Sequence, residues 1–161
     1  MVKANRRAVT VGHARRSAGA TSVEFALMAP LLILTLFGTI ELGSFCKDTL
    51  VLSQSAREGA RTAGVGSPVA TVSSRVGAAA VTVSRARITT TCAYRTISNG
   101  VWSNWYTLTD SGDTNAAPSG AQIKVTVQYP HPLITGVLSS QLPNVSNGCI
   151  SLASTAIARR E

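Results

Sequence analysis

The chain has 161 residues, enough for one modest domain and a membrane anchor. Charged residues make up 14% of it, against roughly 25% in an ordinary soluble domain, which favours a protein of a membrane or of an assembled polymer. The net charge of +8 does not indicate nucleic-acid binding, because the cations are either gathered before the first acid or scattered without aromatic neighbours.

An uncharged run of residues, 25–40, predicts a membrane-spanning helix. With Val23 before it and residues 42–45 after it, the apolar stretch reaches about 20 residues, roughly the length that crosses ~30 Å of hydrocarbon. A buried helix of a soluble protein would need a larger surrounding domain than the rest of the chain supplies. An ordinary cleaved signal peptide is disfavoured, because bulky or charged residues stand where its peptidase needs small ones.

The flanking charges predict the direction of this anchor. Cations precede the run, whereas only Lys47 beside Asp48 follows it closely, so the N-terminus is expected in the cytoplasm and the rest of the chain outside. Glu41, near the far end, is expected to reach the outer interface. Glu24 lies at the inner edge of the run, where an ionisable residue usually has a function and a partner. The preceding cations are Lys3, Arg6, Arg7, Arg15 and Arg16.

The helical pattern continues beyond the membrane to about residue 63. Ala56, Ala60 and Ala63 form a stripe of small residues at helical spacing, with the arginines of the same segment on a neighbouring face. Glycines and a proline at 64–68 end this stalk. Such a stripe packs closely against either the chain's own head or a neighbouring subunit. Residues 69–84 are expected to form a second short helix.

From residue 85 onward the sequence pattern predicts β-strands. Runs at 86–97, 100–108, 121–129 and 149–159 alternate or are rich in β-branched and aromatic residues, and each is bounded by turn signals. The predicted fold is therefore α+β, with a long N-terminal helix and a small antiparallel β-sheet head. Trp102, Trp105 and Tyr106 are expected in its core rather than in an exposed contact patch.

Cys92 lies in one predicted strand and Cys149 begins the last one, both on the exported side where oxidation is permitted, so a Cys92–Cys149 disulfide is expected. Cys46 is expected to be free. His131 stands between two prolines, which indicates a rigid turn. No metal spacing, phosphate cradle or nucleophile–base pair occurs, so neither a cofactor nor an enzyme activity is predicted.

Three sequence blocks together point to a family. Residues 15–27 combine a basic leader, a terminal Gly19 and an apolar helix whose Glu24 is the fifth residue after the glycine. Residues 37–41 and 56–61 follow in order. This arrangement resembles type IV prepilins, and more closely the TadE-like minor pilins (pseudopilins) of the tight-adherence, or Flp, pilus system. The matching stalk motif consists of Ala56, Arg57, Glu58, Gly59, Ala60 and Arg61.

The resemblance implies a processing site and an assembly contact. A prepilin peptidase at the inner membrane would cut between Gly19 and Ala20, just before Glu24 and Phe25. Glu24 would then pair with the free α-amine of Ala20 on a neighbouring pilin, since two ions in an apolar setting are each costly alone. Without this role, Glu24 would be an interfacial residue facing lipid headgroups. The implied domains are a leader (1–19), a transmembrane helix with stalk (20–64) and an exported head (65–161).

The expected function is therefore that of a structural, membrane-anchored pseudopilin. Its partners would be membrane lipid, a prepilin peptidase and other pilins of the same system, with no nucleic acid. The alternative is a membrane-tethered periplasmic binding or adhesion module that never polymerises. The mature N-terminus separates the two, because only the pilin is cut at Gly19.

Overall fold

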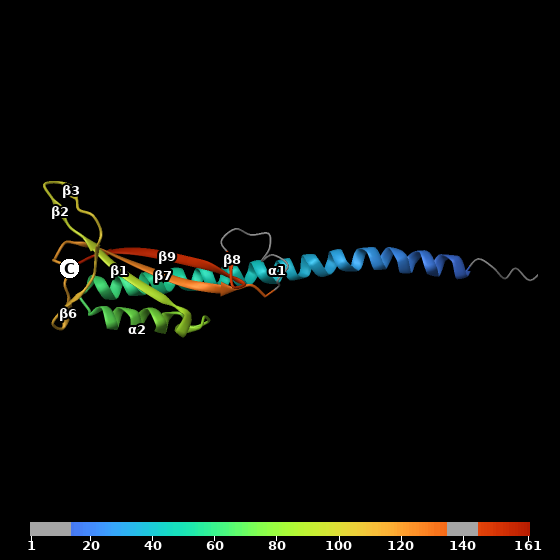
Figure 1. Ribbon diagram of the computed structural model, residues 1–161, viewed down its shortest axis with the longest axis horizontal. Helices are drawn as coiled ribbons and strands as arrows, with labels where there is room; N and C mark the ends of the chain where they lie inside the picture. Colours follow the sequence, from blue (N-terminus) through green and yellow to red (C-terminus); the bar gives the residue numbers. More distant parts are fainter. Residues whose placement is uncertain (1–13, 135–144) are drawn as a thin grey trace, which may run out of the picture. The chain divides into compact units, whose positions relative to one another are not determined.

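The computed structural model describes residues 14–134 and 145–161, with side chains from residue 19 onward. The chain divides into two compact units between Ile40 and Glu41, and helix α1 (Ala14–Gly64) contributes to both. Beyond α1, the second unit holds a short helix and a small antiparallel sheet (Figure 1). The predicted fold class, α+β with a long N-terminal helix and a small antiparallel head, is confirmed.

Two short helical elements follow α1, namely α2 (Val69–Ala79) and the 3₁₀ turn η1 (Arg85–Arg87). The long strands are β1 (Thr89–Arg95), β7 (Gln122–Pro132) and β9 (Cys149–Arg159). The remaining strands have two residues each: β2 (Ile97–Ser98), β3 (Val101–Trp102), β4 (Tyr106–Thr107), β5 (Asp110–Ser111), β6 (Thr114–Asn115) and β8 (Val145–Ser146).

The main sheet has the strand order β4-β1-β7-β9-β8, and every described pair in it is antiparallel. The alternation expected in the central strand is present, because Ile123, Val125 and Val127 are fully buried on one face. On the other face, the hydroxyls of Thr126 and Thr155 lie 3.0 Å apart across two strands. The sheet therefore has one packed face and one face toward solvent, which explains its period-2 pattern.

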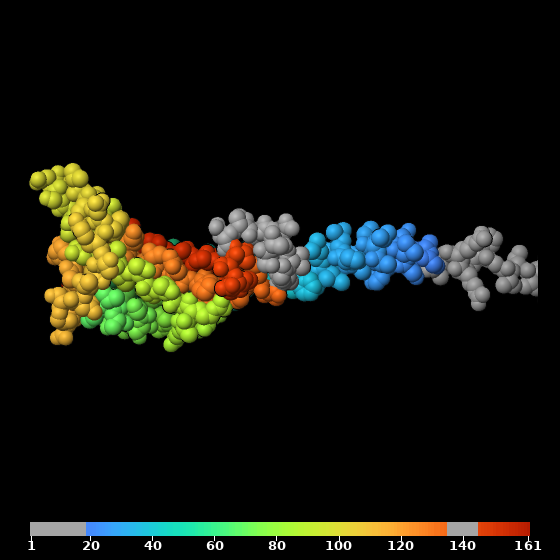
Figure 2. All heavy atoms as spheres, viewed as in Figure 1, coloured from blue at the N-terminus to red at the C-terminus, as the bar shows by residue number. Residues whose placement is uncertain are grey.

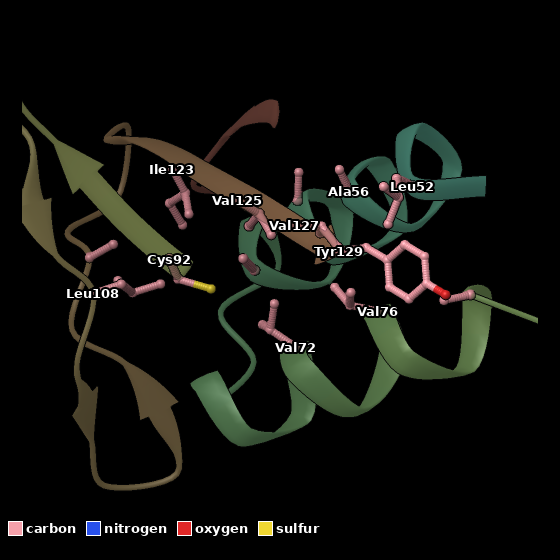
Figure 3. Packing of buried hydrophobic residues seen from close by; sticks show 14 of the residues in the cluster. Leu52, Ala56, Val72, Val76, Cys92, Leu108, Ile123, Val125, Val127 and Tyr129 are labelled. Atoms are coloured by element: carbon pink, nitrogen blue, oxygen red, sulfur yellow. The ribbon is translucent and has the colours of Figure 1, made fainter. Parts of the chain in front are cut away.

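Helices α1 and α2 meet at the packed face of the sheet (Figure 3). The small-residue stripe of α1 makes this possible, since Ala56 and Ala63 are completely buried. A Cβ at Gly59 would lie 2.5 Å from Val76 Cγ2 of α2 and 3.1 Å from Val125 Cγ1 of β7. The stalk stripe thus packs against the chain's own head, which decides between the two partners left open by the sequence.

Residues distant in the sequence cap the C-terminal end of α1. Asn115 of β6 donates through Nδ2 to the carbonyls of Ala63 and Ser67, at 2.9 and 3.0 Å, and the backbone N–H of Glu161 donates to Gly64 at 3.0 Å. Gly66, at φ +91°, turns the backbone out of the helix. Helix-end carbonyls that would otherwise lack partners are therefore satisfied by residues distant in sequence.

Two predicted elements differ in extent. The second helix stops at Ala79 instead of residue 84. The run at 100–108 is two short strands, β3 and β4, because the Asn99–Gly100 turn, with φ of 51° and 81°, folds β3 back on β2. Trp102 and Tyr106 are exposed and Trp105 is half-buried, so the prediction that these aromatics form core was wrong.

Candidate functional site: the anchor helix and the head

The four residues of the predicted processing site lie on one helix. Gly19, Ala20, Glu24 and Phe25 all belong to α1 and are exposed. Ala20 and Glu24 are four residues apart and therefore on the same helix face. Among the described residues, Glu24 has no hydrogen bond or ion pair, and a Cβ at Gly19 would meet nothing within 4 Å. The packing described for this unit thus requires neither the glycine nor the carboxylate.

The anchor exposes apolar side chains in every direction. One helix in the described part of the chain is long and apolar enough to cross a membrane. The mean hydropathy of its most apolar 18 residues is 2.0, and none of these residues is buried. The hydroxyls of Thr35 and Thr39 are satisfied within the helix, because they donate to the carbonyls of Leu32 and Thr35, each at 2.8 Å. This surface needs either lipid or other apolar helices around it.

The stalk motif has an inner and an outer face. Ala56, Gly59 and Ala60 are buried in the head, whereas Arg57 and Arg61 are exposed. Arg61 donates two hydrogen bonds to the Glu58 carboxylate in a bidentate arrangement, with Nε 3.1 Å from Oε2 and Nη2 2.9 Å from Oε1. This hydrogen-bonded ion pair lowers the pKa of Glu58 and raises the pKa of Arg61. The motif therefore combines internal packing with one outward arginine, Arg57, that is in no described ion pair.

A buried contact between Asp48 and His131 joins α1 to β7, and the sequence did not reveal it. Asp48 Oδ2 lies 2.8 Å from His131 Nδ1, and both side chains are almost completely buried. The Phe45 ring meets the imidazole edge-on at 6.0 Å. His131 is thus part of strand β7 and not a turn. The signal was available, because His131 continues the alternation Ile123, Val125, Val127, Tyr129 on the buried face.

Glu41 is also inside the head. It is only 4% exposed, and its two carboxylate oxygens accept the backbone N–H of Ile134 at 3.1 and 3.0 Å. The Glu41 carboxylate thus has a partner within the chain, and its expected place near the outer interface stays a prediction. Glu41 and Asp48 lie on the same stretch of α1, and each binds the end of β7 or the residues just after it. Both carboxylates serve to attach the sheet to the helix.

The expected disulfide is absent: Cys46, Cys92 and Cys149 are all free thiols. Cys92 lies opposite Val125 of β7, which lies opposite Ala156 of β9. Cys149 is seven residues farther along β9, or about 24 Å at strand spacing. A disulfide needs Cα atoms within about 7 Å, so these two cysteines cannot be bridged in this fold. Burial, followed by the nearby charge of Asp110, raises the pKa of Cys92 to about 11.

Cationic and aromatic side chains are in contact in the head, and the sequence did not predict these contacts. The Arg95 guanidinium lies over the rings of Trp102 and Trp105, 4.9 and 4.5 Å from their centroids. Lys124 Nζ lies 4.4 Å from the Trp105 centroid. These contacts join residues that are separate in sequence because β1 pairs with β7 beside the Trp-bearing loop. The expectation that the scattered cations lack aromatic neighbours was wrong at this place.

Within residues 19–134 and 145–161, no three His, Cys, Asp or Glu side chains are placed to share a metal ion. A cavity of about 210 Å³ lies between α1 and β9, lined by Phe45, Thr49, Leu52 and residues 151–154. Its lining holds backbone and hydroxyl groups but no ionisable side chain. The cavity therefore suggests no acid–base or nucleophilic chemistry.

A comparison with known families agrees with the resemblance drawn from the sequence. The model of the family described as TadE-like protein matches residues 19–61, from the predicted cleavage glycine to the last arginine of the stalk motif. This match confirms the predicted resemblance over helix α1, and the head lies outside it. No curated protein and no solved structure matches the chain.

Proposed function

Because residues 19–61 match the TadE-like family, a structural family associated with pili, we propose that this chain is a membrane-anchored pseudopilin of a tight-adherence (Flp) pilus system. The match is the observation that carries the proposal, since it covers the predicted processing site, the anchor and the stalk motif. The proposed role is structural: the chain takes part in assembling the pilus and performs no catalysis.

Processing is the first proposed step. A prepilin peptidase removes residues 1–19 by cutting between Gly19 and Ala20. Glycine suits this position because the absent side chain lets the backbone enter a protease cleft. The exposure of Gly19, and the empty space around it, support a requirement set by the peptidase instead of by packing.

Assembly is the second step. The exposed Glu24 carboxylate, at the start of an apolar surface, pairs with the α-amine of Ala20 on a neighbouring pilin. The apolar side chains of residues 23–40 contact lipid before assembly and neighbouring helices afterwards. The cations before the anchor keep the N-terminus cytoplasmic, so that the head is exported from the inner membrane.

The mature N-terminus tests this proposal. Cells producing the chain with the prepilin peptidase of its own system should yield a membrane-bound form that begins at Ala20, read by N-terminal sequencing and intact mass. Without the peptidase the leader should remain. A chain that stays uncut in the presence of an active peptidase would overturn the pseudopilin role and favour a tethered module that does not polymerise.

Two glycine variants provide a matched pair. A Cβ at Gly19 and a Cβ at Gly43 both meet nothing within 4 Å, so neither glycine is required by packing and Gly19→Val and Gly43→Val can be compared. Gly19→Val should block cleavage, whereas Gly43→Val should be cut like the natural chain. Equal cleavage of both variants would remove Gly19 from the recognition site.

A further inference from the structure

The β2–β3 hairpin stands out from the head as a well-defined protrusion (Figures 1 and 2). Its base is closed by two hydrogen bonds, from the backbone N–H of Ser103 to the Thr96 carbonyl at 2.8 Å and from the Thr96 N–H to Ser103 Oγ at 3.1 Å. The Asn99–Gly100 turn, with both residues at positive φ, has the conformation of a tight hairpin turn. The protrusion is therefore built from defined contacts.

The hairpin exposes large apolar side chains. Ile97 is 49% exposed, Val101 69% and Trp102 37%, and Ile97 lies opposite Trp102 in the strand pair. Nothing in the described structure covers them. A group of exposed apolar residues on a protrusion marks a contact surface more often than a single exposed residue does.

Two cations are held beside the hairpin without an acidic partner. Arg95 lies against Trp102 and Trp105, and its Nε donates to Gln122 Oε1 at 2.9 Å, so its position is fixed. Lys124 lies on the Trp105 ring. In the part of the chain that the structure describes, neither cation is within ion-pair distance of a carboxylate. Both charges therefore remain available to an acidic group from outside.

The patch lies at the end of the head opposite to Glu41. Arg95 and Gln122 are paired across β1 and β7, and Gln122 is paired with Arg159, next to the end of α1 at Gly64. At the other end of β7, His131 contacts Asp48. Gly64 lies sixteen positions after Asp48, which is about 24 Å along the helix. The patch is thus separate from the Asp48–His131 contact.

We propose that Ile97, Trp102, Trp105, Arg95 and Lys124, here called the hairpin patch, dock onto another protein whose contact surface carries carboxylates around an apolar pocket. Trp and Arg are the residues that most often carry binding energy at protein interfaces. A nucleic acid or an acidic polysaccharide would meet the charges but would leave Ile97 and Val101 in water. The Trp105 ring is already in contact with two cations, which leaves less of it for stacking on bases.

A second copy of this chain is a poorer match for the patch. Glu41 and Asp48 are buried, Glu58 is paired with Arg61, and Glu24 lies in the apolar part of α1. Asp110, Asp113 and Glu161 are exposed, but Asp110 accepts the Val69 N–H, and all three have polar, glycine or arginine neighbours in the sequence instead of apolar ones. The described cavity beside β9 is lined by no carboxylate. The acidic and apolar surface that the patch requires therefore belongs to a different protein. This inference goes beyond the proposed function and does not depend on cleavage at Gly19.

Carbodiimide cross-linking tests the proposal in membranes of cells that contain the complete pilus system. The reagent activates a carboxylate, and the Lys124 amine then forms an amide bond with it while the reagent leaves as a urea. Mass spectrometry of the product should show Lys124 joined to an Asp or Glu of a different protein. Lys124→Arg keeps the charge but has no such amine, so this product should disappear.

Two substitutions show whether the product depends on the hairpin. Ile97→Ser and Trp102→Ala should each lower the yield at least about fivefold, while Thr91→Ala, on an exposed strand position, should leave it unchanged. Ile97 is exposed, so Ile97→Ser keeps the test valid if Trp102→Ala fails to fold. A Lys124 product that joins two copies of this chain, a yield unaffected by Ile97→Ser, or no product above that of Lys124→Arg would overturn the proposal. N-terminal sequencing of the same sample reports processing separately.

Discussion

Asp48 and His131 are 83 residues apart in the chain, yet their side chains meet at 2.8 Å in the interior of the head. This contact ties the central strand of the sheet to helix α1, close to where Glu41 accepts the backbone N–H of Ile134. A buried carboxylate is costly without a partner, so the two residues stabilise the head as a pair rather than singly.

Breaking that pair should therefore destabilise the head strongly. His131→Ala leaves Asp48 with only the half-exposed Lys47 ammonium, 3.3 Å from Oδ1, and should lower the free energy of unfolding by about 1–3 kcal/mol. Urea unfolding of the detergent-solubilised chain, followed by tryptophan fluorescence, measures the loss. Gln128→Ala, at an exposed position of the same strand, should change it little. The double variant Asp48→Leu/His131→Leu should lose less stability than the single variants Asp48→Leu and His131→Leu added together; strict additivity would show that the residues do not interact.

The close packing of α1, α2 and β7 at Gly59 leaves no room for a side chain at this position. Gly59→Ala puts a Cβ 2.5 Å from Val76 Cγ2, so it should destabilise the head by about 1–3 kcal/mol despite the better helix propensity of alanine. Gly77→Ala is the matched control, because its Cβ meets only ordinary contacts with Arg85 and should gain about 0.5–1 kcal/mol. Comparable stability of the two variants in the same urea experiment would contradict the packing described here.

The three cysteines should differ in reactivity. With its pKa raised to about 11, the Cys92 thiol is protonated at pH 8, and it is also buried, so maleimide should not label it in the native protein. Its reactivity should increase only as the pH approaches 11, since the thiolate forms as pH rises through the pKa. Cys46 is exposed and should be labelled at pH 8. Mass spectrometry after denaturation without reductant should count three free thiols; a Cys92–Cys149 cross-linked peptide would refute the strand register.

Replacing Glu24 should separate anchoring from assembly. Glu24→Ala should reach the membrane fraction in normal amounts, because the apolar helix is unchanged. Its amount in sheared pili should fall at least about tenfold, since the α-amine of Ala20 on a neighbouring pilin loses its acceptor. Immunoblots of the two fractions measure the ratio, with Thr39→Val as an uncharged control in the same helix. Normal incorporation of Glu24→Ala would leave Glu24 as an interfacial residue only.

The sequence predicted the features that depend on local pattern. Local patterns do not depend on the tertiary arrangement. They include the apolar run at 25–40, the small-residue stripe at Ala56, Ala60 and Ala63, and the alternation at 121–129. The family resemblance also rested on contiguous residues, which is why it was confirmed for the anchor and stalk. The strand Cys149–Arg159 was predicted with the observed bounds for the same reason.

Three of the errors share one cause, which is that they concerned contacts set by the strand register. Cys92 and Cys149 are both in strands, but the register puts them about 24 Å apart. His131 has prolines on both sides, and only its position on β7 shows that it faces α1. Arg95, Lys124 and the tryptophans are brought together by strand pairing, which their spacing in the sequence does not reveal.

The sequence by itself therefore determined a long apolar N-terminal helix with a small-residue stripe, an α+β fold and a family resemblance in that helix. These follow from hydrophobicity and periodicity, which are properties of neighbouring residues. Only the tertiary structure decided that the stalk stripe packs on its own head, that Asp48 meets His131, that no disulfide closes and that two cations flank an exposed hairpin. Those outcomes depend on strand register and helix docking, where a shift of one residue exchanges the buried and exposed faces.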